Sequence, residues 1–428
     1  MEQPLKNPEL IASTLETYRC SITESKKRED ILLESSSSQP TGLEKRQENQ
    51  DESNYFKTAL WLLTTNESPD GTSVLTSNAD NTIRTFIIPP NLLSSEELIR
   101  LTPYTRHKNP APVNCLLAFP LFDLSSPSTT LYLSTPNGFP IRMLNALSPS
   151  PVIVSSYNLI SETTESYITP ASKAFLSFSQ FFTGSDSLIA LFDLSNNGSA
   201  PILRLPTIPS KRHRMKGGGV GMRGIVSSMA IQTGQNETLA AGTWTRWVGL
   251  YDAAGLGGTI ANWSVAKAAD EVASIGGSGI SQVIWSQCGR YLCVAERMSN
   301  GLMIFDVRVT GRLLAWLKGR KASTNQRLAV DLFQTKSGIE VWAGGTDGVV
   351  RVWENIGSKS GALERDWEWQ AHEDPVTSTA VHSSGTVVAT CSGQKSLSAF
   401  ESSDNDSDSS SPYQKKDLYD NCLKIWRI

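Results

Sequence analysis

Short polar turns alternate with strand-like apolar segments along the chain, and six of these segments end on an aromatic residue. An acidic residue usually follows the aromatic one. The six aromatic residues are Phe86, Phe192, Tyr251, Phe305, Trp353 and Trp426. A repeating unit of roughly 40 to 50 residues, built from short strands, is typical of a β-propeller with WD-type blades. The sequence therefore predicts an all-β fold, a seven-bladed WD-repeat β-propeller.

We expect the propeller to occupy residues 55–428. The approximate blade limits are 57–101, 112–154, 171–206, 223–263, 279–317, 326–369 and 374–428. Blade two lacks the aromatic-acid ending, and blade seven is interrupted by an acidic, Ser-rich insertion at 402–420, expected to be a mobile loop. The usual hydrogen-bond network of WD blades is mostly degenerate. Asp347 with Trp353, and His372 at the start of blade seven, are interpreted as partial copies with a structural role.

Residues 1–54 form an N-terminal extension. Residues 10–22 contain enough apolar and β-branched side chains for one strand, which would close the ring by pairing with the last blade. A short helix or a disordered tail is the alternative. Residues 24–54 are rich in Glu, Lys, Ser and Gln, and such a segment cannot bury enough apolar surface to offset its ordering entropy, so we expect disorder.

Charge is nearly balanced over the 428 residues, with 39 basic and 42 acidic side chains, so nucleic-acid binding would need local basic patches. The six cysteines are scattered without a CxxC pair, which favours reduced thiols over disulfides or a zinc site. No secretion signal and no apolar run of about 20 residues is present. We expect an intracellular, monomeric propeller without membrane contact, cofactor or metal.

Catalytic chemistry finds little support in the sequence. The four histidines are isolated from one another, and no carboxylate cluster or metal-ligand spacing accompanies them. The protein is therefore not expected to be an enzyme. Ser407 and Ser409 in the insertion are flanked by acidic residues, which makes them candidate phosphorylation sites. A plain solvated insertion is the alternative.

Two long windows contain basic but no acidic residues, between Asp193 and Glu237 and between Asp306 and Asp331. In a propeller, connections between blades emerge on the same face as the turns between second and third strands. Basic side chains attract phosphates, and an exposed Trp can stack on an unpaired base. The candidate RNA-binding residues are Lys211, Arg212, Arg214, Lys216, Trp244, Arg246, Arg320, Lys321 and Arg327.

Each of these assignments has an alternative. The basic loops could be ordinary solvated connections, and Trp244 could pack between blades. Arg327 could instead be buried in an ion pair with Asp331 or Asp347.

Two segments, 279–286 and 319–331, are distinctive, above all Thr-Asn-Gln-Arg at 324–327. In these segments the chain resembles the telomerase Cajal body protein family of WD-repeat RNA-binding proteins. Residues 68–84, 89–93 and 388–394 with the acidic insertion add to it. The likeness extends from about Phe56 to the C-terminus.

The resemblance implies a nuclear, non-enzymatic propeller that binds small nuclear or Cajal-body guide RNAs, or telomerase RNA. Related fungal proteins are linked to pre-mRNA splicing, so the implied role is localisation or assembly of ribonucleoproteins, or splicing, with ribonucleoprotein or splicing proteins as partners. By the same resemblance, we expect the chain to differ from animal members in lacking their long proline-rich N-terminal region. The alternative is a protein-only scaffold that docks peptides of nuclear assembly or splicing factors.

Overall fold

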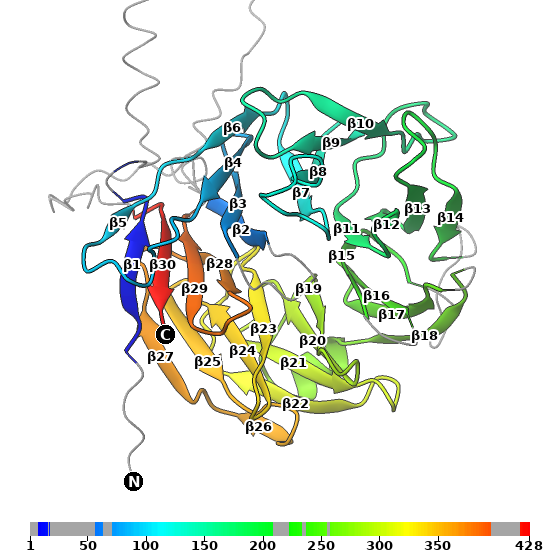
Figure 1. Cartoon of the computed structure of the whole chain (residues 1–428). Coiled ribbons are helices and arrows are strands. Elements are labelled where there is room, and N and C mark those ends of the chain that lie inside the picture. The colour runs from blue at the N-terminus through cyan, green and yellow to red at the C-terminus, as the bar shows by residue number, and fades with distance from the viewer. Residues whose placement is uncertain are drawn as a thin grey trace, which may run out of the picture.

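The repeats fold into seven sheets that stand around a common centre (Figure 1). The computed structural model describes residues 7–15, 17, 56–62, 71–208, 222–232, 237–254, 257–394 and 420–428. The predicted all-β, seven-bladed propeller is confirmed. The prediction of disorder at 24–54, and that of a mobile insertion up to residue 419, lie outside the described residues.

Blades one to four each contain four strands, which follow one another from the inside of the ring outwards. They are β2 (Phe56–Leu62), β3 (Ser73–Asn78), β4 (Thr82–Ile87) and β6 (Thr105–Lys108); β7 (Val113–Ala118), β8 (Leu131–Pro136), β9 (Ile141–Asn145) and β10 (Ile153–Tyr157); β11 (Ser172–Phe175), β12 (Gln180–Ser185), β13 (Leu188–Asp193) and β14 (Leu203–Pro206); β15 (Val226–Ile231), β16 (Thr238–Thr243), β17 (Trp247–Asp252) and β18 (Thr259–Ser264).

Blades five and seven carry additional outer strands. Blade five has β19 (Ile280–Trp285), β20 (Tyr291–Glu296), β21 (Gly301–Asp306), β22 (Leu313–Lys318) and the parallel β26 (Gly361–Leu363). Blade six has β23 (Val330–Gln334), β24 (Ile339–Gly344), β25 (Val349–Trp353) and β27 (Trp367–Gln370). Blade seven has β28 (Val376–Val381), β29 (Val387–Ser392), β30 (Leu423–Arg427), β1 (Glu9–Ser13) and β5 (Ile99–Arg100).

The aromatic residue that ends the third strand is buried in all six copies of the repeat. Successive side chains of a strand point to opposite faces, so these rings fill the space between neighbouring blades. Blade two lacks such a residue, yet its four strands are complete. Tyr132 on the second strand and Leu144 on the third belong to the buried cluster between blades one and two.

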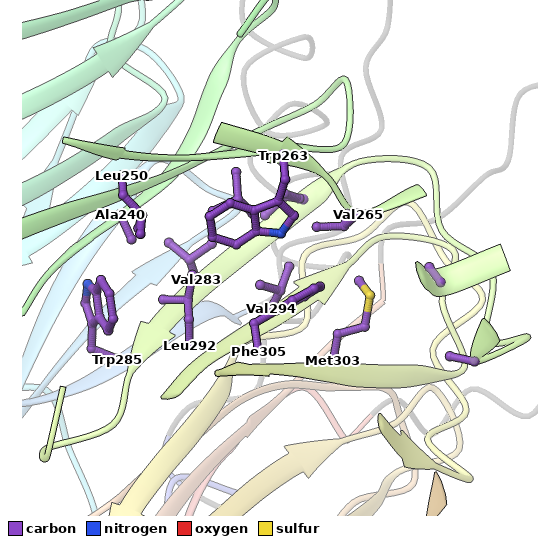
Figure 2. Packing of buried hydrophobic residues seen from close by; sticks show 14 of the residues in the cluster. Ala240, Leu250, Trp263, Val265, Val283, Trp285, Leu292, Val294, Met303 and Phe305 are labelled. Carbon is purple, nitrogen blue, oxygen red and sulfur yellow. The ribbon is translucent and has the colours of Figure 1, made fainter. Parts of the chain in front are cut away.

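Neighbouring blades pack face to face through apolar side chains. Figure 2 shows the contact between blades four and five, where Trp263 and Phe305 meet with ring centroids 5.7 Å apart. The indole of Trp285 in the same cluster donates a hydrogen bond to the carbonyl of Ala230, at 3.1 Å. Burial of apolar area is the main favourable term in this packing, and the indole of Trp285 keeps its hydrogen bond when buried.

The strand β1 lies in the last blade although it comes first in the sequence. It pairs antiparallel with β30, in a register that places Glu9 opposite Arg427. The hydroxyl of Thr14 accepts a hydrogen bond from the amide of Leu423, at 3.0 Å. The expected closing strand at 10–22 thus corresponds to a strand at Glu9–Ser13 that joins the two ends of the chain.

Blade seven contains a complete four-residue hydrogen-bond network. The Nδ1 atom of His372 lies 2.8 Å from Oδ2 of Asp420, and its Nε2 lies 2.7 Å from Oγ1 of Thr390. The indole of Trp426 donates to the same Oγ1 at 2.9 Å. This network corrects the interpretation of His372 as part of an incomplete copy, because Asp420 takes the position of the turn acid.

Two adjacent residues hold the ends of the long connection between β29 and β30. The amide of Gly393 donates to the carbonyl of Pro375 at 3.0 Å, before the connection begins. The amide of Asp420 donates to the carboxylate of Asp374 at 2.6 Å, where the connection ends. The blade is therefore fixed on both sides of residues 395–419.

Three blades share an ion pair between the turn acid and the residue four positions later. The pairs are Asp80 with Arg84 at 2.5 Å, Asp347 with Arg351 at 2.7 Å and Asp420 with Lys424 at 2.8 Å. In blade six, Nε1 of Trp353 has no hydrogen-bond partner among the described residues. Asp347 and Trp353 are thus structural residues that pair and pack separately, without the network of blade seven.

Arg320 is part of the core. Its exposed fraction is 1%, and its Nε and Nη2 atoms donate to the carbonyls of Gly344 and Leu328 at 3.0 and 2.9 Å. Burial lowers the pKa of Arg320 to about 10, so its guanidinium stays charged at neutral pH. Because backbone carbonyls occupy this cation inside the protein, it offers no surface to a phosphate, which corrects its assignment as an RNA contact.

The blade-seven network predicts an acid-sensitive fold. Burial lowers the pKa of His372, and the charge of Lys424 acts in the same direction, while the hydrogen bond to Asp420 opposes it. The unfolded chain therefore binds more protons below pH 6.5, and stability falls as the pH drops through that value. We expect the urea midpoint of the wild type to fall more between pH 7 and pH 5 than that of His372→Gln. Burial also lowers the pKa of His107, so some pH dependence of stability remains in both proteins. An equal fall of the urea midpoint in the wild type and in His372→Gln would contradict this role of His372.

The burial of Arg320 predicts a large effect on stability. Arg320→Ala leaves two buried carbonyls without their charged donor and should cost about 3 kcal/mol of unfolding free energy. Lys321→Ala at the adjacent exposed position is the matched control, with a change within about 0.5 kcal/mol. Urea denaturation monitored by Trp fluorescence measures both, and similar losses in the two variants would refute the structural role.

Candidate nucleic-acid interface

One face of the ring collects the turns between second and third strands together with the connections between blades. Strands within a blade alternate in direction, so these two kinds of loop emerge at the same end. We call this the interblade face. It contains the turn between β16 and β17, the turn between β20 and β21, and the connection that precedes β23.

The centre of the ring holds a cavity of about 840 Å³. The inner strands, or residues next to them, contribute to its lining in all seven blades. Among its described lining residues are four cationic side chains and one carboxylate: Lys57, Lys173, Arg297, Arg327 and Asp186. This central cavity, called the channel below, is therefore electropositive. A cleft lined by one sign of charge concentrates ions of the opposite sign.

Trp244 lies at this cavity, in the turn between β16 and β17. Its exposed fraction is 46%, so it does not fill the space between blades. The guanidinium carbon of Arg297 lies 4.6 Å from the centroid of its ring, in the corresponding turn of the next blade. Trp244 and Arg297 thus present an aromatic ring and a cation side by side. Proteins that bind single-stranded nucleic acids combine such groups, since an unpaired base stacks on the ring and the cation attracts the phosphate backbone.

Arg246 follows two residues after Trp244, but its guanidinium is fully engaged. It pairs with Asp270 at 2.7 Å and with Glu296 at 2.8 Å, and both carboxylates accept two hydrogen bonds from it. The hydrogen bonds to Asp270 and Glu296 raise the pKa of Arg246 further, despite partial burial. Its assignment as a phosphate contact is therefore not kept. Its carboxylate partners come from the β18–β19 connection and the next blade, and sequence spacing gives no sign of them.

The connection before β23 holds two further candidates with different surroundings. The side chain of Lys321 is 70% exposed, and its ammonium lies 3.5 Å from the carboxylate of Asp347. Arg327 lines the cavity and donates from Nη2 to the carbonyl of Ser227, at 2.6 Å. Lys321 stays available to a phosphate in solution, and Arg327 is available from inside the channel.

Arg327 does not form the ion pairs that the sequence allowed as alternatives. The carboxylate of Asp331 accepts hydrogen bonds from the amides of Leu332 and Val381, at 2.8 and 2.7 Å. Asp347 is paired with Arg351. Burial lowers the pKa of Arg327.

Sequence reasoning missed Arg297 and Lys173, which line the channel. A signal for Arg297 was its position in the turn of blade five that corresponds to the turn of Trp244. Lys173 is the one charged residue of the inner strand Ser-Lys-Ala-Phe. Lys211, Arg212, Arg214 and Lys216, like Ser407 and Ser409, lie outside the described residues.

His372, Asp420 and Cys422 place three possible metal ligands within 4.8 Å of one another. Both ring nitrogens of His372 are already used, by Asp420 and Thr390. The cluster is therefore explained by the hydrogen-bond network of the blade.

Within the described part of the chain, no helix is long and apolar enough to cross a membrane.

Comparison with protein-family models gives no match. Curated relatives do match. Telomerase Cajal body protein 1 of Mesocricetus auratus is 27% identical over 350 residues, 80% of this chain and 59% of the relative. Guanine nucleotide-binding protein negative regulator 1 of Schizosaccharomyces pombe is 24% identical over 308 residues, 71% of each chain. Protein SWT21 of Vanderwaltozyma polyspora is 25% identical over 312 residues, 70% of this chain and 68% of the relative.

The matched region spans about 59% of the length of the hamster Telomerase Cajal body protein 1. None of the three names is that of an enzyme. The match with Telomerase Cajal body protein 1 covers most of the propeller. An identity of 27% indicates common descent but does not carry the role of individual residues from one protein to the other. The chain is therefore a seven-bladed propeller and a distant homologue of Telomerase Cajal body protein 1 and Protein SWT21.

Proposed function

We propose that this protein is an RNA-binding propeller that takes part in the localisation or assembly of small nuclear ribonucleoproteins, or in pre-mRNA splicing. The name of its relative, Telomerase Cajal body protein 1, supports an association with ribonucleoproteins of the nucleus. The proposed location is the nucleus, with the Cajal body as the finer assignment. The proposed RNA is a small nuclear or Cajal-body guide RNA, or telomerase RNA.

The observation that carries the proposal is the exposed indole of Trp244, stacked against Arg297 at an electropositive channel. A base in a duplex already stacks on its neighbours, so such a platform selects unpaired bases in loops or ends. One base would stack on the face of the Trp244 ring that Arg297 leaves open, and Arg297 would contact a neighbouring phosphate. An RNA hairpin with a single-stranded loop is the substrate class that fits.

The phosphate contacts on the same face come from two sources. Lys321 is exposed on the interblade face, and Arg327 reaches the channel from the same connection. Lys211, Arg212, Arg214 and Lys216 belong to the proposal on sequence grounds, since they fall in the connection between blades three and four. Together these cations would track the backbone on either side of the stacked base.

A protein scaffold is the second candidate, and one observation favours it. The Schizosaccharomyces pombe relative is named as a negative regulator of a guanine nucleotide-binding protein. In that case the interblade face would dock a peptide, and RNA would be absent from the native complex. Crosslinking in the source cells followed by sequencing of bound RNA separates the two candidates, because only the first predicts reads concentrated in small nuclear RNAs.

The stacking role predicts that Trp244→Ala weakens binding to an RNA hairpin with an unpaired loop by about 5- to 150-fold, from about 1–3 kcal/mol per stacked base. Phe178→Ala is the matched control, because Phe178 is 66% exposed and lies in the turn between β11 and β12, on the opposite face. Fluorescence anisotropy with labelled hairpin measures both. A Trp244 variant that binds like the Phe178 variant would exclude this base contact.

The phosphate role predicts a change in salt dependence for Lys321→Glu. Loss of one phosphate contact should weaken binding at low salt and make the plot of log Kobs against log salt less steep by about 1. Lys359→Glu is a close control, since Lys359 also lies 3.5 Å from a carboxylate but follows the third strand of blade six, away from the interblade face. Filter binding at several salt concentrations measures the slope, and an unchanged slope would remove Lys321 from the site.

A further inference from the structure

The most unusual side chain of the channel is Lys173. It lies on the inner strand β11, its exposed fraction is 5%, and it lines the central cavity. Its Nζ atom has no hydrogen-bond partner within the part of the chain that the structure describes. A buried ammonium normally pairs with a carboxylate or carbonyl oxygens, so this one is incomplete.

The surroundings of Lys173 do not neutralise it. Burial lowers the pKa of Lys173 to about 8, and the nearby thiol of Cys115 acts in the opposite direction. At neutral pH most molecules therefore still carry this charge inside the ring. Removing an ammonium from water without a partner is costly, and the cost is recovered only when an anion binds.

Two arginines line the same cavity as Lys173. The Nε atoms of Arg297 and Arg327 also lack hydrogen-bond partners among the described residues. The charge of Arg327 lowers the pKa of Arg297, after the larger effect of burial, which shows that the two guanidinium groups repel each other. Cys115 lines the same cavity and raises the pKa of both Lys173 and Arg327, so both cations lie within its electrostatic range.

The described lining of the cavity contains too little negative charge to neutralise its cations. Asp186 is the one carboxylate among its described lining residues, and it is exposed. It already accepts a hydrogen bond from the hydroxyl of Ser187, at 3.1 Å. It is therefore not a partner for Lys173, with which it shares no ion pair among the described residues.

We propose that the central channel is a binding site for a compact anion bearing several phosphate groups, held by Lys173, Arg297 and Arg327. Guanidinium groups bind phosphate through paired N–H donors, and lysine adds a point charge. A cavity of about 840 Å³ has the size of a small-molecule site. The site is independent of the proposed RNA contacts in its key residue, because Lys173 lies in the inner strand and not on the interblade face.

Thermal unfolding of the full chain with pyrophosphate or inositol hexakisphosphate as probes tests this site. Sodium chloride at matched ionic strength serves as the blank. At about 100 times its Kd, the bound probe should raise Tm by about 3 °C. No rise above the salt blank with either probe would overturn the proposal.

The variant Lys173→Met keeps most of the length of the side chain and removes the charge. We expect it to raise Tm without probe by about 2 °C, since an unpaired buried charge is lost, and to abolish the probe-dependent rise. A lysine with a merely structural role would instead lower Tm when replaced. Lys267→Met, at a side chain that is 81% exposed, is the control and should change neither value. A probe-dependent rise that survives in Lys173→Met would refute the site.

Cys115 reports the location without any substitution. It lines the cavity, whereas Cys288 is exposed elsewhere. Peptide mass spectrometry after iodoacetamide treatment should show that inositol hexakisphosphate slows alkylation of Cys115 and leaves Cys288 unchanged. Equal rates at Cys115 with and without probe would place the anion outside the channel and contradict the proposal. Trp244→Ala should retain this protection, so that failure of the RNA site and failure of the anion site give different results.

Discussion

A propeller ring stays closed only if its first and last segments are joined, and the pairing of β1 with β30 meets this constraint. An unpaired strand edge exposes a row of backbone donors and acceptors that other chains can bind. The edge of the last blade is covered by residues from the other end of the chain, with Ile11 and Ala12 buried in the cluster beneath. Every blade can then pack against two neighbours, and the inner strands are held at a common centre. The channel and the interblade face both follow from this closure.

The cost of burying charge determines which basic residues are available for function. Arg320 satisfies its donors with backbone carbonyls, and Arg246 satisfies its donors with two carboxylates. Both are basic in the sequence but belong to the scaffold. Lys173 is the opposite case, because its ammonium is buried without such partners among the described residues. The cost of burying an unpaired charge therefore excludes Arg320 and Arg246 as ligand contacts. The same cost identifies Lys173, which is hidden from the surface, as a candidate contact.

The repeat and its period predicted the seven-bladed all-β ring, which the structure confirms. The apolar and β-branched side chains of residues 10–22 predicted a closing strand near the N-terminus, which corresponds to β1. Individual side-chain partners that are distant in sequence were not predicted for His372 and Arg246. Asp420 completes the network of His372 from 48 residues away, beyond an insertion that separates it from Thr390. Glu296 neutralises Arg246 from the next blade. Lys321 belongs to the acid-free window before Asp331, yet its ammonium lies 3.5 Å from the carboxylate of Asp347. An acid-free window in the sequence therefore does not imply an acid-free surrounding in space.

The two ends of the connection between β29 and β30 are fixed by neighbouring residues, since Pro375 binds Gly393 and Asp374 binds Asp420. The network of blade seven needs only these anchored ends. The entropic cost of joining two fixed points by a loop grows with the logarithm of the loop length, and each doubling costs only about 0.6 kcal/mol. A longer or shorter connection between Gly393 and Asp420 should therefore change the stability of the ring little, as long as these two anchors keep their hydrogen bonds.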